Sequence, residues 1–470
     1  MLKSRYQERT QAIQSLSHSP GRNYRRPTVH PLRLPALGFL GLITLGTFLL
    51  WLPPATTSPI RLIDAFFTAT SASCVTGLAV VDTGTRFTLF GQFVLMVLME
   101  IGGLGIMTIS TLLMLVAGGR AGLSGQVVLL ANYTQADGSF SPSKILREVF
   151  KFTLIIEGVG AVIYFTQVPH LPLFKRIFFS IFHSVSAFCN AGFSTLSTSF
   201  THYRGDWIFN LNTCLLIVSG GIGFLTLSEL FRWRKKNTVN RLSLHSRLAL
   251  STSALLILVG MAAILFFDFN NTLRHLSWPE KLLASFFQSV TSRTAGFNTL
   301  DIHLLSAPTL FTIMILMYIG GSPGSCAGGI KTTTSAVMGI LGINRFLGRE
   351  RTQIMSRTIP EETVDSATRL FVVSIAIIAI ATLLLSSVET WHLHGEASHA
   401  FFLKALFECI SAFATCGLSM DLTPTLSDPS KLILIVLMYV GRLGPLGIIT
   451  AVAKTTEERP WYAEEHIMIG

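Results

Sequence analysis

The sequence predicts an all-α integral membrane protein built from four repeats, and three observations carry this prediction. Half of the 470 residues are apolar, only 13% are charged, and the mean hydropathy of +0.55 exceeds what soluble globular chains usually show. Apolar runs of about 20 residues, the length that a membrane-spanning helix needs, recur along the chain. A short motif that ends in glycine and a large apolar residue occurs four times between these runs.

The apolar runs define eight candidate spans and fix their orientation. The strongest are residues 34–53, 248–267 and 370–388, and the weaker ones are residues 87–117, 152–168, 208–228, 308–330 and 432–453. Eight crossings place both termini on one side, and that side holds most of the Lys and Arg residues. By the positive-inside rule, both termini are expected to face the cytoplasm. This topology accounts for the net charge of +11, which therefore needs no nucleic-acid partner.

Two polar tails flank the spans. Residues 1–33 are basic and lack the apolar core of a cleaved signal peptide, so they are expected to form a soluble cytoplasmic tail. Their positive charges either orient the chain or also contact membrane lipid, and the first explanation is the simpler one. A second cytoplasmic tail is expected at residues 455–470.

The repeated motif reads CVTGL, CNAGF, RTAGF and ATCGL, and its glycines are Gly77, Gly192, Gly296 and Gly417. Successive glycines are 115, 104 and 121 residues apart, which suits a repeated membrane unit and exceeds solenoid periods. A Phe stands ten residues before each glycine, and a second glycine follows 24 to 28 residues after it. The predicted repeats are residues 34–118, 149–232, 247–345 and 369–454.

Each repeat is expected to contain an outer helix, a pore half-helix, a filter loop and an inner helix. The apolar stretch before each motif is only about ten to fifteen residues long, too short to cross the membrane. The four repeats run in the same direction, so they are parallel repeats around a pseudo-fourfold pore. Irregular backbone at membrane depth is tolerated only inside protein or along a water-filled cavity. The glycine loops should therefore line that pore, where glycine lets carbonyl oxygens turn inward and replace the hydration shell of a monovalent cation.

Two features of the inner spans predict a gate. GGSPGSCAGGIKTTT, residues 320–334, places five glycines and a proline inside the third inner span, so a loop is expected there, with a passive kink as the alternative. Arg442 stands at mid-span in the fourth repeat, where the others have glycine, and should repel cations; the alternative is an ion pair with Glu100. The predicted gate residues are Gly320, Gly321, Pro323, Gly324, Gly328, Gly329, Lys331 and Arg442.

These motifs resemble those of a known family. The four glycine loops, TAGFN at 294–298, GGSPGSCAGGIKT at 320–332 and YVGRLGPLG at 439–447 are similar to motifs of the Trk/Ktr/HKT superfamily of potassium transporters. With eight spans, the chain most resembles the membrane subunits of bacterial Ktr uptake systems, of the KtrB kind, over about residues 35–460.

The resemblance implies K⁺ uptake across the cytoplasmic membrane, often with a dependence on Na⁺. It also implies a homodimer that sits on a cytosolic, nucleotide-binding regulatory ring of the KtrA type. The implied K⁺ ligands are the backbone carbonyls of Cys74, Val75, Thr76, Gly77, Cys189, Asn190, Ala191, Gly192, Arg293, Thr294, Ala295, Gly296, Ala414, Thr415, Cys416 and Gly417.

Four polar side chains near the loops have expected roles. Arg293 would block a cation inside the pore, so it is expected to turn away and bond carbonyls or an acid behind the third loop. Glu157, in an outer span, is expected to pair between helices, with a coupling-ion role as the alternative. Asn190 and Thr76 either brace filter carbonyls or cap helix ends, and the sequence favours neither role.

Other function classes fit less well. GSCAGGIKT is not a phosphate-binding loop, because Ile330 separates Gly329 from Lys331. The six cysteines show no metal-ligand spacing, and no nucleophile and base are arranged for an intramembrane enzyme. The remaining rival is a secondary cation transporter, coupled to Na⁺ or protons, that works by alternating access. Such a protein should show inverted repeats and paired midmembrane carboxylates.

Overall fold

The computed structural model describes residues 33–105, 142–235, 242–391 and 396–444. Over these ranges the chain is helical, as predicted, apart from one unexpected antiparallel hairpin of the strands β1 (Gln353–Ile354) and β2 (Arg357–Thr358). The predicted tails, except for Arg33, lie outside the described residues. So do the predicted ends of the first and fourth repeats, residues 106–118 and 445–454.

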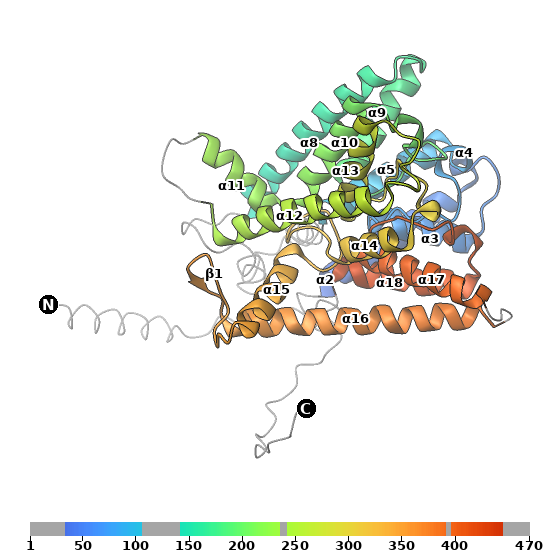
Figure 1. The fold of residues 1–470 in the computed structure, drawn as a ribbon. Coiled ribbons are helices and arrows are strands. Elements are labelled where there is room, and N and C mark those ends of the chain that lie inside the picture. Colours follow the sequence, from blue (N-terminus) through green and yellow to red (C-terminus); the bar gives the residue numbers. More distant parts are fainter. Residues whose placement is uncertain (1–32, 106–141, 236–241, 392–395, 445–470) are drawn as a thin grey trace, which may run out of the picture.

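Twelve helices of the described ranges fall into four groups of three (Figure 1). The first two groups are α2 (Arg33–Trp51), α3 (Leu62–Ser73) and α5 (Leu89–Gly103), then α8 (Pro142–Gln167), α9 (Leu173–Phe188) and α10 (Trp207–Gly221). The other two are α12 (Leu244–Phe267), α13 (Trp278–Thr291) and α14 (Ala307–Tyr318), then α16 (Glu361–Glu389), α17 (Glu396–Ala414) and α18 (Asp428–Leu443).

Shorter elements join or extend these groups. They are η1 (Pro53–Ala55), α4 (Thr83–Arg86), η2 (Thr201–Tyr203), α11 (Phe224–Lys235), η3 (Ile302–Leu304), α15 (Thr332–Phe346) and η4 (Thr423–Thr425). Figure 1 shows α11, α15 and β1 at one end of the bundle and α4 at the opposite end.

The four groups pack in a closed cycle. Within each group, the first helix lies against the second. Between groups, the third helix of one packs on the second helix of the next: α5 on α9, α10 on α13, α14 on α17, and α18 on α3. Because the last of these contacts returns to the first group, the first and fourth helix groups are brought together by packing.

The second helix of each group carries a buried Phe that anchors it. Phe67, Phe182 and Phe407, each ten residues before a motif glycine, are fully buried. In α13, Phe286 stands ten residues before Gly296 but is only partly buried, and the neighbouring Phe287 is fully buried instead. The third half-helix is therefore shifted by one residue relative to the other three.

Helix lengths divide the apolar segments into two kinds. By length and composition, three helical segments can cross a membrane: Arg147–Gln167 within α8, Leu244–Phe267 (α12) and Glu361–Glu389 (α16). Four other apolar helical segments are shorter: Ala36–Trp51 within α2, Leu89–Gly103 (α5), Trp207–Gly221 (α10) and Ala307–Tyr318 (α14). Large apolar side chains such as Leu258, Phe266 and Leu383 are more than half exposed on the long helices, as expected for surfaces that face lipid.

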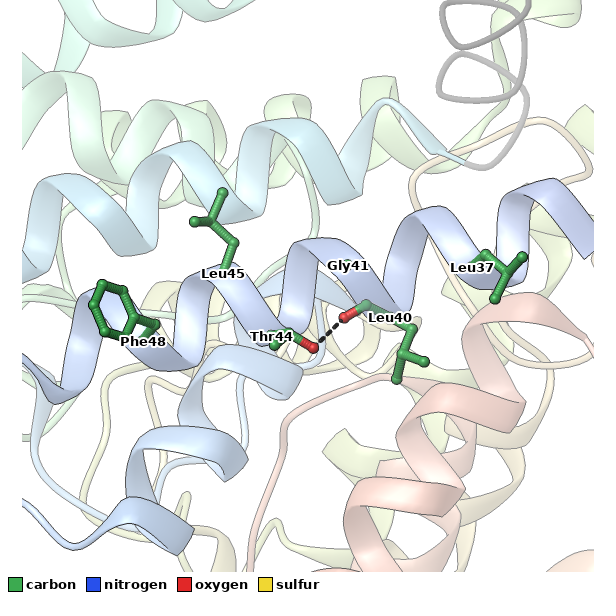
Figure 2. A pocket seen from close by; sticks show the side chains of 6 residues that line it. All are labelled: Leu37, Leu40, Gly41, Thr44, Leu45 and Phe48. Carbon is green, nitrogen blue, oxygen red and sulfur yellow. Dashed lines mark hydrogen bonds between the residues drawn. The ribbon is translucent and has the colours of Figure 1, made fainter.

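The outward face of α2 is apolar in the same way. Figure 2 shows a surface pocket that is lined by Leu37, Leu40, Gly41, Thr44, Leu45 and Phe48, all from this one helix. The Thr44 hydroxyl donates to the Leu40 carbonyl at 2.8 Å, so it presents no free donor to the pocket. This surface suits acyl chains and offers no ligands for an ion.

Two of the predicted spans are not continuous helices. Residues 208–228 break between α10 and α11, where Gly223 adopts a φ of 93°, and the helical part of residues 308–330 ends at Tyr318. The two breaks bond to each other. Ser322 N donates to Gly221 O at 2.9 Å, and Phe224 N donates to Gly324 O at 3.1 Å. Backbone groups that would otherwise lie unpaired at membrane depth are satisfied in this way.

Candidate functional site

The four motifs begin where the four second helices end, at Ser73, Phe188, Thr291 and Ala414. The residue two positions before each glycine has a positive φ: 56° for Val75, 59° for Asn190, 67° for Thr294 and 49° for Thr415. The glycines Gly77, Gly192, Gly296 and Gly417 also have positive φ, between 70° and 94°. Positive φ is rare for β-branched residues, so the four loops share one unusual backbone conformation.

The four loops touch one another in order. A Cβ added to Gly77 would lie 2.5 Å from Ala191 O, one added to Gly192 would lie 2.9 Å from Ala295 O, and one added to Gly296 would lie 2.5 Å from Cys416 O. At Gly417 the same test meets Thr76 O, which returns to the first loop. Each glycine thus faces the carbonyl that precedes the next glycine, and no larger residue fits there.

Hydroxyl groups in the last turn of each half-helix hold these loops. Ser71 and Ser411 Oγ accept from Gly77 N and Gly417 N at 3.1 and 3.0 Å. Ser186 Oγ and Thr291 Oγ1 donate to Phe193 O and Phe297 O, both at 2.7 Å. The recurrence of small hydroxyl residues at this place is the sequence signal that could have identified them.

Two buried titratable side chains hold the chain just after the second and fourth glycines. Glu408, nine residues before Gly417, accepts bonds from Met420 N at 3.2 Å, Thr423 Oγ1 at 3.0 Å and Ser419 Oγ. His183, nine residues before Gly192, has Nε2 3.1 Å from Ser194 Oγ and 3.3 Å from Thr195 N. Both side chains are fully buried. Sequence reasoning missed both residues, although their equal spacing from glycine was available.

Three polar residues that the sequence placed near the loops, Arg293, Asn190 and Thr76, differ in their hydrogen bonds. The Arg293 guanidinium donates to Ser253 Oγ at 3.0 Å and to Gly320 O at 3.2 Å, which is the expected bonding to a carbonyl away from the loop axis. In its preferred orientation, the Asn190 amide donates to Ile217 O and Ala187 O. The Thr76 hydroxyl is buried and has no hydrogen-bond partner among the described residues, so it braces no carbonyl.

The glycine-rich segment of the third group lies against the third and fourth motif loops. A Cβ on Gly328 would lie 2.5 Å from Ala414 O, and one on Gly320 would lie 3.2 Å from Thr294 Cγ2. Its base is closed by paired backbone bonds, Gly320 N to Ile330 O at 2.9 Å and Ile330 N to Tyr318 O at 3.1 Å. The predicted loop is therefore present, and it reaches the inner end of the fourth motif.

Two cationic side chains bond this segment. Lys331 Nζ donates to Ala327 O at 2.6 Å, within the segment itself. Arg442 is 9% exposed and donates to Cys326 O and to Gly102 O. Among the described residues, neither Arg442 nor Glu100 takes part in an ion pair, so the alternative pairing of these two is wrong. Arg442 instead joins three of the four groups through carbonyls.

The second glycine of three groups, 24 to 28 residues after the motif glycine, allows close packing on the half-helix ends. A Cβ at Gly102, Gly220 or Gly441 would strike the carbonyl of Ser73, Phe188 or Phe413, each four residues before a motif glycine. In the third group, Gly320 meets Gly328 O instead. The glycine-rich segment thus occupies in the third group the place that a half-helix end occupies in the others.

One acidic cluster was not visible in the sequence. Glu100, Glu157 and Cys189 each offer a ligand atom within 4.8 Å of the others. These residues come from α5, from α8 and from the residue that follows α9, and only packing brings them together. The six cysteines are all free and buried.

Comparisons with known proteins agree on one class. The family model described as a cation transport protein, TrkH, matches residues 38–461. The chain is 39% identical to the Ktr system potassium uptake protein B of Bacillus subtilis, with 94% of this chain and 97% of the relative covered. It is 38% identical to the potassium/sodium uptake protein NtpJ of Enterococcus hirae, with 95% and 98% covered. The crystal structure of the potassium transporter TrkH from Vibrio parahaemolyticus shares this fold with a TM-score of 0.72 at 19% identity, covering 93% of this chain and 88% of that one.

Proposed function

This chain belongs to the TrkH family of cation transport proteins, and from that membership we propose that it takes up K⁺ across the cytoplasmic membrane. The proposed topology has eight spans with both termini in the cytoplasm. The sequence repeats and the closed cycle of helix packing support four parallel repeats around one pore.

The proposed selectivity filter is the ring of four motifs. The observation that carries this proposal is that each motif glycine faces the carbonyl before the next glycine, around all four groups. Four carbonyl oxygens at one level offer the ligands that replace the hydration shell of K⁺. The half-helices end at the same place, and the partial negative charge of their C-termini favours a cation. The proposed ligands are the carbonyls of residues 74–77, 189–192, 293–296 and 414–417.

The proposed gate is the segment from Gly320 to Lys331 together with Arg442. This segment lies against the inner end of the fourth motif, so an ion leaving the filter meets it directly. Arg442 holds its Cys326 carbonyl and places a positive charge nearby. Opening requires that this bond be released or moved.

The proposed regulation follows from the likeness to Ktr proteins. The Bacillus subtilis relative is named as protein B of a Ktr system, which supports a partner protein for this chain. The proposed partner is a cytosolic nucleotide-binding ring, and the proposed assembled state is a homodimer. The name of the Enterococcus relative includes sodium, which supports Na⁺ dependence.

An alternating-access cation transporter is the second candidate. One observation favours it, namely the meeting of Glu100 and Glu157 beside the first and second groups, because coupled transporters use intramembrane carboxylates. The motifs and helix groups follow one another in the same order, however, and inverted repeats are what that mechanism uses.

Uptake of ⁸⁶Rb⁺ distinguishes the candidates. The full chain with its regulatory partner should take up ⁸⁶Rb⁺ into proteoliposomes, and should restore growth at low K⁺ to a bacterium that lacks its own K⁺ uptake. A pore should pass ⁸⁶Rb⁺ down its own gradient without any Na⁺ or proton gradient. Uptake that follows an imposed Na⁺ or proton gradient at zero Rb⁺ gradient would support alternating access instead.

A further inference from the structure

Two glutamates meet at the interface between the first and second helix groups. Oxygens of Glu100 and Glu157 and the sulfur of Cys189 all lie within 4.8 Å of one another. The Cys189 thiol donates to Glu100 Oε2 at 3.4 Å. Glu157 is only 7% exposed, whereas Glu100 is half-buried, so an ion has an access route on the Glu100 side.

In two other groups, the residue at the position of Glu100 is a tyrosine that forms neutral hydrogen bonds with the next group. Glu100 stands two residues before Gly102, and the equivalent residues are Tyr318 and Tyr439. The Tyr318 hydroxyl donates to Phe371 O at 3.2 Å and lies 2.7 Å from Ser374 Oγ, on the first helix of the next group. The Tyr439 hydroxyl donates to Ala36 O at 2.7 Å, again on the next group. In the fourth such place, between the second and third groups, the residue is Val218.

At the joint between the first and second groups, two acceptor groups face each other. A carboxylate has no donor of its own when ionised, so a proton or a cation must lie between them. Across residues 33–105, 142–235, 242–391 and 396–444, neither carboxylate forms an ion pair with Lys, Arg or His. A pair of uncompensated charges at this depth would be very costly.

One oxygen of this pair, Glu157 Oε1, lacks a partner. This oxygen is buried and has no hydrogen-bond partner among the described residues. The comparable buried glutamate, Glu408, is different because its two oxygens accept bonds from two hydroxyl groups and one amide. Burial alone therefore does not leave a glutamate oxygen unpaired in this protein. The unpaired acceptor oxygen of Glu157 points to a proton or a cation as its partner.

We infer that Glu100 and Glu157 form a binding site for one small monovalent cation, of which Na⁺ is the type, beside the first and second motifs. The two carboxyl groups share a proton, and the cation supplies the second positive charge, so the site is neutral when it is filled. Carboxylate oxygens suit a hard cation, and the Cys189 thiol acts as a hydrogen-bond donor to Glu100. Ca²⁺ is disfavoured because it needs about six to eight oxygen ligands, and two carboxylates supply at most four.

Direct binding of ²²Na⁺ to the purified full chain tests this site. The measurement is made with an excess of K⁺, so that the proposed filter holds K⁺ and does not retain sodium. Retention of one ²²Na⁺ per chain is expected. Glu157→Gln and Glu100→Gln should each weaken sodium binding by at least roughly 10–100-fold, the loss seen when even the outer partners of metal ligands are changed. Both replacements keep side-chain volume and a hydrogen bond across the joint, so folding should survive.

Glu389→Gln is the control. It neutralises a partly buried glutamate at the end of α16 that accepts from Ser427 N and Ser427 Oγ, away from the four motifs, so retention of ²²Na⁺ should be unchanged. Thermal unfolding provides a second readout, because a ligand that binds only the folded state raises the midpoint. Added Na⁺ should raise the unfolding midpoint of the unaltered chain and of Glu389→Gln, and fail to raise that of Glu157→Gln.

Equal retention of ²²Na⁺ in the unaltered chain and in Glu157→Gln would overturn the inference. So would the absence of retained ²²Na⁺ in the unaltered chain, which would leave a proton as the only bridge between the carboxyl groups. A link between this site and Na⁺-dependent uptake rests on the proposed function. The binding measurement involves no transport, so a failure of K⁺ uptake would leave its result interpretable.

Discussion

Lys431 Nζ lies 2.7 Å from Asp64 Oδ1, and this ion pair joins residues 367 positions apart. Both side chains are largely buried, at 8% exposure for Lys431 and 13% for Asp64. They connect the start of α18 with the start of α3, where the fourth helix group meets the first. The chain itself links every other pair of neighbouring groups, so this contact closes the cycle at the one interface without a peptide connection.

Loss of Lys431 should therefore destabilise the folded chain. Lys431→Met removes the buried partner of the Asp64 carboxylate, which then keeps only the exposed Arg61, whose Nε lies 3.4 Å from Asp64 Oδ2. Loss of a buried partner typically costs about 3–5 kcal/mol, and the exposed Arg61 offsets part of that cost. The expected result is a clearly lower unfolding midpoint in detergent. Asp428→Asn is the control, because the Arg61–Asp428 pair is more than half exposed on both sides and such pairs contribute about 1 kcal/mol or less. Equal midpoints for the two variants would contradict the assignment of Lys431 as the closing contact.

Gly296→Ser should damage ion selection. The new Cβ would lie 2.5 Å from Cys416 O, and the residue would have to keep a φ of 83°. The carbonyl ring must then shift, which should lower the affinity for K⁺ or its discrimination against Na⁺. The measurement is ⁸⁶Rb⁺ uptake in competition with Na⁺. Gly41→Ser is the control, since nothing lies within 4 Å of its Cβ position, and unchanged competition in both variants would remove Gly296 from the filter.

Arg442→Gln should increase flux without the regulatory partner. The shorter, neutral side chain no longer bonds the Cys326 and Gly102 carbonyls together and no longer repels cations at that place. The expected outcome is a higher initial rate of ⁸⁶Rb⁺ uptake into proteoliposomes that contain this chain alone. Arg176→Gln provides the comparison, because Arg176 also donates to a carbonyl, that of Phe165 at 2.6 Å, but it lies in α9 away from the glycine-rich segment. A rate that stays at the unaltered level in both would show that Arg442 does not restrict the pathway.

Deletion of residues 323–328 should also raise flux. The deletion removes Gly328, which lies against the inner end of the fourth motif, and Cys326, which Arg442 holds. Uptake of ⁸⁶Rb⁺ should then be faster and should no longer respond to the regulatory partner. Gly339→Ala in α15 tests whether any change near this segment has the same effect, since its Cβ would meet nothing within 4 Å. A deletion variant with ordinary flux would leave the segment as a spacer.

Glu408→Ala should disturb the fourth motif from behind. It leaves Met420 N and the hydroxyls of Ser419 and Thr423 without their buried acceptor, and each unsatisfied buried group costs about 1–3 kcal/mol. We expect a lower unfolding midpoint together with a higher K⁺ concentration at half-maximal uptake. Glu408→Gln, which can still bond the two hydroxyls, should restore most of both properties. A lower midpoint with unaltered K⁺ dependence would give Glu408 a structural role only.

Much of the fold could be predicted from the sequence because the membrane imposes a strong constraint. A helix is the simplest way to satisfy backbone groups in lipid, so apolar runs predicted helices at 34–53, 248–267 and 370–388. The four motifs marked the ends of the second helices correctly, since each is followed directly by the loop that bears its glycine. The glycine-rich segment at 320–334 was likewise predicted as non-helical, because glycine and proline oppose helix continuation locally.

Contacts between distant residues could not be predicted in the same way. The helix break at Gly223 was missed because it depends on contacts with another group. Phe224 N donates to Gly324 O, and Gly223 lies against the carbonyl of Pro323. Residue spacing gave no sign that Glu100 would meet Glu157, since they lie on different helices with a long segment between them. The partners of Arg442 were missed for the same reason, and the ion pair considered for it is absent.

The sequence by itself determined that this is a helical membrane protein whose chain carries the glycine motif four times, because local composition decides which segments enter lipid and where a helix must stop. Only the tertiary structure decided that each loop glycine faces the next loop's carbonyl, that Lys431 closes the cycle on Asp64, and which groups Arg442 holds. Those outcomes depend on how side chains and carbonyls from distant segments pack together. Close packing requires matching shapes and bonding partners from two segments at once, and neither segment encodes this alone.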